Sequence, residues 1–259
     1  MDLSKYGTYD RYISISKKFH PERVCYITLM GSRVYGCHNE DSDYDYYGFY
    51  MPTPEQINPM AYGYVEGIDE PKPMDNWRLE GDDSEVTLYA LPRYLKLLAG
   101  GHPNMIESLF TRKVDHLIRD NVGDLIYNRR YEFISKATFV QTLNYARSQV
   151  KRVDRKSIGM RKVLCDQFGY DVKSAAHSIR LIDNSIQLLQ NGFIVLDNIK
   201  DTTLSIRAGN WSLDRYKLEV SIALENLEDA ERGSALKDSV DIEFVKHIYR
   251  KCTKIFYEV

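Results

Sequence analysis

One segment, Met30–Asp45, constrains the fold of this chain more than any other. It starts at the end of the run VCYITLM (Val24–Met30), which is short, apolar and partly β-branched, as in a buried strand. Gly31 and Ser32 then break the strand with a tight turn from which a short helix can start. The free N–H groups of such a helix start, together with a serine hydroxyl, are suited to holding phosphate oxygens.

Two aspartates follow this turn, Asp43 and Asp45, the first of them eleven residues after Ser32. Because side chains alternate across a strand, we expect both carboxylates on one face of a strand that continues into Tyr46–Met51. Paired carboxylates aimed at a phosphate-holding turn are what a divalent metal bound to a nucleoside triphosphate requires. The simpler alternative is an acidic loop that serves only solubility. Against it, residues 40–45 crowd four acidic side chains together, which a bound cation would relieve.

The motif GSRVYG (31–36) followed by SDYD (42–45) resembles the polymerase-β-type nucleotidyltransferase superfamily. More narrowly, it resembles the branch of predicted nucleotidyltransferases that has been linked to RNA repair. Glu85–Phe110 extends the similarity through its Asn-Pro…Glu-x-Leu element, in which His102 takes the place of the asparagine, and Gly169–Ile182 extends it further. The similarity runs from about residue 24 to about residue 215. It implies an NTP as substrate and Mg²⁺ or Mn²⁺ as the metal.

The resemblance also implies a third carboxylate on a later strand. Glu85 aligns with that position, where the family has aspartate, and Asp82 and Asp83 just before it are alternatives. In the simpler interpretation, Glu85 is the polar first residue of an amphipathic strand that shares its face with Thr87 and Tyr89.

A later helix carries a second candidate surface. Asp171 can cap this helix, and Lys173, His177 and Arg180 then fall at positions i, i+4 and i+7, so they share one face. This face is a candidate for contacting the triphosphate or an acceptor phosphate, and an exposed polar stripe is the alternative. Glu107 has two interpretations as well, because it can orient the acidic site or simply cap and solvate its own helix.

Strand signals are short up to about residue 90 and include a polar insertion, Pro52–Ser84, that we interpret as a long loop or a flap near the site. From Pro92 onward the pattern is helical. The predicted helices lie within 91–100, 102–110, Val114–Tyr127, Lys136–Arg155, Val172–Gln190, Leu213–Glu231 and Ile242–Phe256. The expected fold is α+β, with a small mixed β-sheet as catalytic domain (1–111) followed by a mainly helical domain (112–259).

Charge is distributed unevenly along the chain. Residues 1–111 carry 10 Lys and Arg against 17 Asp and Glu, whereas residues 112–180 carry 15 against 7. An acidic lobe followed by a basic segment is a suitable polarity for gripping a triphosphate or a nucleic-acid backbone. The alternative is that the basic segment supplies only the solvated faces of helices.

The four cysteines are scattered without zinc-ligand spacing, so we expect free thiols in a reducing cytoplasm, with Cys25 and Cys165 in the core. No apolar stretch approaches the ~20 residues of a membrane helix, and the first residues lack the apolar core of a signal peptide. We therefore expect a cytoplasmic protein without membrane contact.

Together these features predict metal-dependent transfer of a nucleoside monophosphate from an NTP to a hydroxyl acceptor, with RNA or tRNA ends as the first candidates. Asp43, Asp45 and Glu85 are the expected catalytic residues and hold one or two Mg²⁺ ions. The expected nucleotide-binding residues are Gly31, Ser32, Arg33, Lys173, His177 and Arg180. Two alternatives remain: the same chemistry on a small molecule or a protein hydroxyl, and a catalytically silent nucleotide-binding module.

Overall fold

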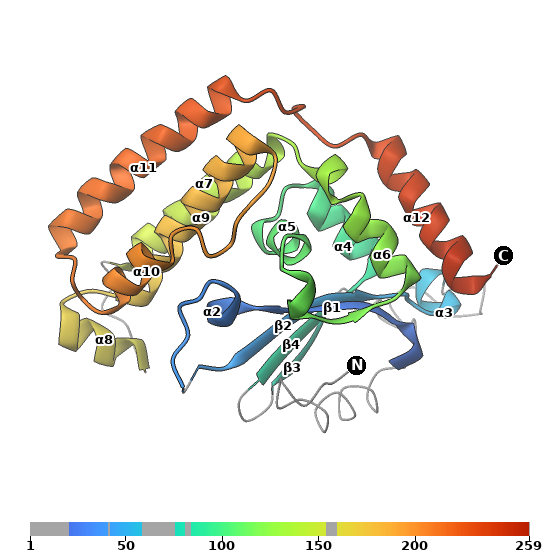
Figure 1. Cartoon of the computed structure of the whole chain (residues 1–259), viewed down its shortest axis with the longest axis horizontal. Coiled ribbons are helices and arrows are strands. Elements are labelled where there is room, and N and C mark those ends of the chain that lie inside the picture. The colour runs from blue at the N-terminus through green and yellow to red at the C-terminus, as the bar shows by residue number, and fades with distance from the viewer. Residues whose placement is uncertain (1–20, 41, 59–75, 81–83, 154–159, 259) are drawn as a thin grey trace.

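The structure, a computed structural model, describes residues 21–40, 42–58, 76–80, 84–153 and 160–258. Its architecture confirms the predicted α+β class, with a mixed sheet in the N-terminal part and a mostly helical region after it (Figure 1). Within the described ranges, no helix combines the length and the apolar character that crossing a bilayer demands.

Five described strands form one sheet in the order β3-β4-β2-β1-β5. Only β2 and β4 run parallel, and the other neighbours are antiparallel. All seven residues of β1 are buried, as its apolar sequence predicts. The strands are β1 (Val24–Met30), β2 (Tyr44–Tyr50), β3 (Asn76–Glu80), β4 (Ser84–Ala90) and β5 (His116–Arg119).

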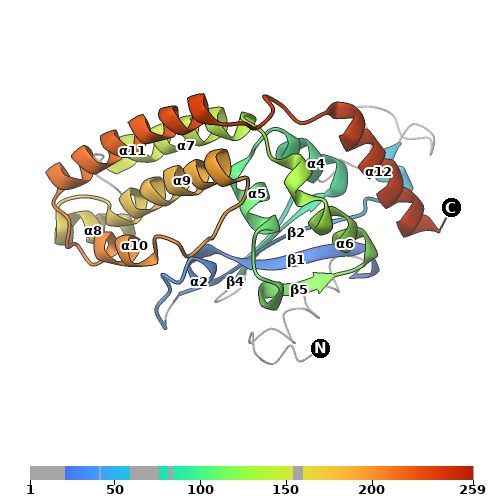
Figure 2. The same ribbon diagram turned by 45° about the horizontal axis from the view of Figure 1, so that its top comes forward.

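The helices form two groups. In Figures 1 and 2, α4, α5, α6 and α12 lie over the sheet, whereas α7 to α11 form a bundle to one side. The short helix α2 continues directly from β1, and the residues just after it contact α9 and α10 through Arg180 and Arg207. The helices are α2 (Gly31–Val34), α3 (Pro54–Ile57), α4 (Leu91–Ala99), α5 (Pro103–Leu109), α6 (Asn121–Asn128), α7 (Ala137–Val153), α8 (Met160–Phe168), α9 (Val172–Asn191), α10 (Lys200–Arg207), α11 (Leu213–Gly233) and α12 (Ile242–Tyr257).

Each group of helices has its own apolar core. Between the sheet and its helices, the ring of Phe49 lies 5.5 Å from that of Tyr26 and 4.7 Å from that of Tyr94. Ile248 and Cys252 of α12 complete this core, so a helix near the end of the chain covers the N-terminal sheet. The second core lies within the bundle, where α7, α10 and α11 pack around α9.

The predicted helix Val114–Tyr127 is wrong in its first half. His116–Arg119 forms β5, which pairs with β1 and places Arg119 opposite Tyr26. Asp120 then accepts a hydrogen bond from the backbone N–H of Gly123 at 2.8 Å and caps α6. The strand forms because the edge of β1 offers backbone partners that a local helical pattern does not reveal. The predicted domain boundary at residue 111 thus lies between β4 and β5, two strands of the same sheet.

The helices predicted over 136–155, 172–190, 213–231 and 242–256 are confirmed as α7, α9, α11 and α12, whereas α8 and α10 were not predicted. The insertion Pro52–Ser84, interpreted as a loop, contains α3 and β3. Residues 59–75 and 81–83 of the insertion lie outside the described residues, and so does the proposed flap. Cys25 is buried as expected, but Cys165 is only partly buried.

We expect His116 to make stability depend on pH. Burial, reinforced by the Arg119 guanidinium, lowers the pKa of His116 to about 4. In the unfolded chain the imidazole of His116 therefore binds a proton near pH 6.5, whereas in the folded protein it binds that proton only near pH 4. The free energy of unfolding should fall as the pH drops through this window, by at most about 3 kcal/mol. Denaturant titrations between pH 7 and 4 measure this loss.

The variant His116→Gln should flatten that part of the pH profile, because glutamine does not titrate. His247→Gln is the matched control, since His247 is exposed on α12. Equal pH profiles for wild type and His116→Gln would contradict the assignment.

Candidate active site

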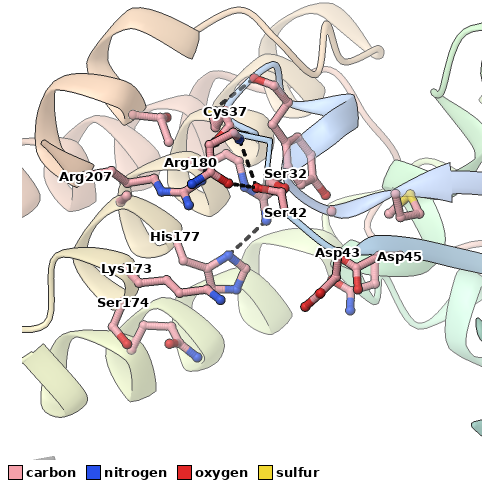
Figure 3. Close-up of a pocket in the computed structure, with 18 of the residues that line it drawn as sticks. Ser32, Cys37, Ser42, Asp43, Asp45, Lys173, Ser174, His177, Arg180 and Arg207 are labelled. Carbon is pink, nitrogen blue, oxygen red and sulfur yellow. Dashed lines mark hydrogen bonds between the residues drawn. The ribbon is translucent and has the colours of Figure 1, made fainter. Parts of the chain in front are cut away.

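A cavity of about 510 Å³ lies where the end of β1 and the start of β2 meet the helical bundle (Figure 3). From the sheet side it is lined by Gly31, Ser32, Asp43 and Asp45, and the bundle adds side chains from α7, α9 and α10. Seven of the nine predicted site residues line this cavity: Gly31, Ser32, Asp43, Asp45, Lys173, His177 and Arg180. Arg33 and Glu85 do not.

The turn after β1 is built around Gly31, whose φ of +67° lies in the left-handed region that favours glycine. Met30 pairs with Asp45 across the two strands, so the Asp45 side chain lies directly over Gly31. A Cβ atom on Gly31 would come within 1.9 Å of Oδ2 of Asp45. The position thus requires glycine both for its backbone conformation and for the space that the carboxylate occupies.

Asp43 immediately precedes β2, and Asp45 is the second residue of that strand. Both line the cavity, which agrees with the predicted shared face. Tyr47 lies two residues further on and lines the cavity as well. Burial, reinforced by Tyr89, Glu85 and Asp45, raises the pKa of Tyr47 to about 12, so the cavity wall here carries a neutral phenol at physiological pH.

Glu85 is the register partner of Asp45 in the parallel pair of β2 and β4. Paired residues of adjacent strands project to the same face of a sheet, so the two carboxylates are lateral neighbours. Asp41, Asp82 and Asp83 lie outside the described residues. Among the residues that are described, no three His, Cys, Asp or Glu side chains come together as a set that could hold a metal ion.

On α9, Arg180 is only 5% exposed and forms an ion pair with Glu107 of α5. Its Nη1 lies 3.0 Å from both carboxylate oxygens, and its guanidinium stacks 3.6 Å from the centre of the Tyr35 ring. Tyr35 and Asn184 donate to the same carboxylate, at 2.5 and 2.8 Å. The interpretations of an exposed polar stripe and of a solvated Glu107 are therefore wrong for these two residues.

The hydrogen bonds of His177 indicate its tautomer. Arg180 can only donate, and its Nη2 lies 2.9 Å from Nδ1 of His177, so Nδ1 accepts (Figure 3). The proton of the neutral imidazole is then on Nε2, which lies 3.3 Å from the Tyr145 hydroxyl of α7. His177 is thus a neutral side chain held between α7 and Arg180.

Arg33 does not reach the cavity. Its Nη2 donates to the carbonyl oxygen of Ser42 at 2.7 Å, and its guanidinium lies 3.6 Å from the centre of the Tyr44 ring. These contacts tie the short helix α2 to the loop before β2. They hold the GSRVYG and SDYD parts of the motif together. The phosphate contact predicted for Arg33 would therefore fall to other cations.

Two such cations were not predicted, Arg152 of α7 and Arg207 of α10. Nη1 of Arg207 donates to the carbonyl oxygen of Cys37 at 2.5 Å, which fastens α10 to the loop after α2. A signal for Arg152 was present in the sequence, because residues 141, 145, 149 and 152 follow one helical stripe. The sequence carried no comparable signal for α10.

The basic segment 112–180 divides between two uses. Several of its cations form ion pairs within the protein, as Arg112 does with Asp115 and Lys136 with Glu231. Arg152 and Lys173 line the cavity, and so does Arg180, whose charge is balanced by Glu107. The positive charge of this segment is therefore partly structural and partly directed at the aspartates.

A buried strand, a Gly-Ser turn, paired aspartates at the start of the next strand and cations facing them across a cavity are the features of a nucleotidyltransferase of the polymerase-β type. A family model described as "RlaP: RNA repair pathway DNA polymerase beta family" matches residues 10–195. Because this match covers more than half of the chain, the chain belongs to this family, which confirms the resemblance inferred from its motifs. A comparison with curated proteins gives no match.

Gly31→Ala should impair both the fold and the site. A non-glycine residue in the left-handed region costs about 1–2 kcal/mol of stability, and the new methyl group also displaces the Asp45 carboxylate. We expect a loss of stability of that size together with at least tenfold weaker binding of Mg²⁺–NTP, about 1.4 kcal/mol. Denaturant titration and calorimetry measure the two effects separately.

Gly192→Ala is the matched control. Gly192 has a similar φ of +74°, but a Cβ added there meets nothing within 4 Å. It should lose comparable stability and bind nucleotide as the wild type does. Equal nucleotide affinities for Gly31→Ala and Gly192→Ala would show that the position of the Asp45 carboxylate does not depend on a glycine at residue 31.

Proposed function

We propose that this protein transfers a nucleoside monophosphate from an NTP to a hydroxyl of an RNA end and releases pyrophosphate. The observation that carries the proposal is the cavity in which Asp43 and Asp45 face Lys173 of α9, with Arg152 and Arg207 also in the lining (Figure 3). Carboxylates on one wall and cations on the other suit a substrate that arrives as a metal–triphosphate complex.

The donor atoms in the cavity fit a magnesium ion. Mg²⁺ is bound through one or two carboxylates together with substrate phosphates, and Asp43 and Asp45 are such a pair. The proposed ligands are these two aspartates together with phosphate oxygens of the NTP. Glu85 is the proposed third carboxylate: it lies beside Asp45 on the sheet but outside the cavity lining, so its side chain would have to turn toward the aspartates. A bound Mg²⁺ or Mn²⁺ would neutralise charge on the reacting phosphates.

The side chains of the protein would position the reactants. Ser32 and the N–H groups of its turn would hold the terminal phosphates, and Lys173, Arg152 and Arg207 would balance their charge. Arg180 has its charge balanced by Glu107, so it would act mainly by holding His177 and Tyr35 in place. Most of the catalysis would come from this positioning and charge balance.

In the proposed reaction, the acceptor hydroxyl oxygen forms a bond to the α-phosphorus of the NTP. The bond between the α-phosphorus and the bridging oxygen breaks, and that oxygen leaves with the electron pair as part of pyrophosphate. The proton of the acceptor hydroxyl passes to a carboxylate. Glu85 is our candidate for this role, because it is the lateral neighbour of Asp45 on the sheet.

A catalytically silent nucleotide-binding module is the second candidate. Two observations on residue 85 favour it: the family has aspartate at this position where this chain has glutamate, and Glu85 does not line the cavity. The third candidate is the same nucleotidyl transfer to a small molecule or a protein hydroxyl, since the cavity by itself favours no particular acceptor.

The test is incubation of the purified protein with Mg²⁺, each α-³²P-labelled NTP and total RNA. The double variant Asp43→Ala/Asp45→Ala serves as the inactive form, and Asp229→Asn is the matched control, because Asp229 is exposed on α11 and pairs with Arg232. We expect labelled RNA only from the wild type and the control. Label on the protein itself would indicate a protein hydroxyl as acceptor, and NTP binding without any transfer would indicate the silent module.

A further inference from the structure

A second cavity, of about 500 Å³, opens beside the first. It is lined by Tyr89, His102, Asn104, Gln141, Asn144 and Tyr145, together with one proline. Asn104 and Tyr145 line both cavities, so the two spaces adjoin at these side chains. Nothing in the proposed mechanism uses the second cavity.

The two cavities differ in their chemistry. Aspartates, arginines and a lysine line the first, whereas no Asp, Glu, Lys or Arg is among the described residues that line the second. The second cavity offers aromatic rings and three side-chain amides. Aromatic faces stack on nucleobases, and amides match the donor and acceptor groups on base edges.

His102, which lines the second cavity, carries one buried polar atom that lacks a partner within the described part of the chain. Nδ1 of His102 is buried and has no hydrogen-bond partner among the described residues. Burial lowers the pKa of His102, so its imidazole is neutral near pH 7 and Nδ1 needs a neutral donor or acceptor. A polar edge of a nucleobase provides either.

One face of α7 runs from the second cavity to the first. Gln141, Tyr145, Gln149 and Arg152 are spaced four, four and three residues apart, so they lie along one face. Gln141 lines the second cavity and Arg152 lines the first. The lining therefore changes from neutral to cationic over about 16 Å of helix, a distance comparable with the length of an extended nucleoside triphosphate.

We propose that the second cavity is the nucleobase subsite of the donor NTP, with the triphosphate at the Arg152 end of α7 and the base at the Gln141 end. This inference rests on the proposed function and adds the residues that recognise the nucleotide. The donor is favoured over the last base of an RNA acceptor because the same helix stripe continues from the neutral cavity into the cationic one.

The experiment compares three probes by calorimetry in the presence of Mg²⁺: an NTP, inorganic tripolyphosphate and a short single-stranded RNA. The variant is Gln141→Ala/Asn144→Ala, whose two side chains are exposed on α7 and whose replacement should not disturb the fold. Val140→Ala is the matched control, because Val140 is 54% exposed on the same helix and lines neither cavity.

We expect the variant to bind the NTP about tenfold more weakly, corresponding to ~1.4 kcal/mol, with tripolyphosphate and RNA affinities unchanged. His102→Ala should in addition narrow the difference in affinity among the four NTPs. An unchanged NTP affinity in the double variant would overturn the subsite. Weaker RNA binding with unchanged NTP binding would assign the cavity to the acceptor base and overturn the donor assignment. A wild type that binds neither tripolyphosphate nor NTP would overturn the proposed function itself.

Discussion

Asp45→Asn is expected to lower nucleotidyl transfer at least ~10³-fold, which corresponds to about 4 kcal/mol of transition-state stabilisation. Asparagine keeps the shape of the side chain over Gly31 but removes the negative charge that a metal–triphosphate complex requires. The measurement is the rate of label transfer from the preferred NTP under single-turnover conditions. The same loss is expected for Asp43→Asn.

Neither Asp45→Asn nor Asp43→Asn should destabilise the fold. Removing one of two neighbouring like charges relieves repulsion, so the free energy of unfolding should stay equal or rise slightly. Denaturant titration of Asp45→Asn tests this expectation. If transfer and stability fell together, Asp45 would be a structural residue, and if transfer persisted, the chemistry would lie elsewhere.

Arg180→Met is expected to cost about 3–5 kcal/mol of stability, because it leaves the Glu107 carboxylate buried without its cation. Glu107 is 1% exposed, and water cannot replace the lost partner. The effect should extend to the site, since Arg180 also holds His177 and stacks on Tyr35. Chemical denaturation gives the stability change.

Two comparisons make this prediction specific. Arg232→Met, at a position that is 66% exposed and paired with Asp229, should change stability by no more than about 0.5 kcal/mol. The double variant Glu107→Gln/Arg180→Met removes both buried charges and should be more stable than Arg180→Met alone. A loss below about 1 kcal/mol in Arg180→Met would mean that the buried pair does not stabilise the fold.

Local pattern was sufficient for the elements whose residues depend on near neighbours. The apolar run of β1 predicts its complete burial, and the helical periods of α7, α9, α11 and α12 predict four long helices. Most of the sheet side of the site is also local, because Gly31, Ser32, Asp43 and Asp45 fall within fifteen residues of one another.

Local pattern was not sufficient where a distant partner decides the conformation. The segment His116–Arg119 forms β5 because β1 has an edge to pair with, and that edge is remote in the chain. Arg33 is a second case in which the partners are near in the chain: the Ser42 carbonyl and the Tyr44 ring meet its guanidinium only because the motif folds back on itself, and the side chain turns away from the cavity. In both cases the competing contact outweighs the tendency that the sequence indicates.

The sequence by itself determined the motif, the four long helices α7, α9, α11 and α12, and the class of chemistry to which the motif points. Only the tertiary structure decided that Arg180 is neutralised by Glu107, 73 residues earlier, and that Arg152 and Arg207 join Lys173 around the aspartates. The physical reason is that periodicity records which face of an element is apolar. The partner that balances a charge is chosen by how the elements pack, and packing depends on the whole chain.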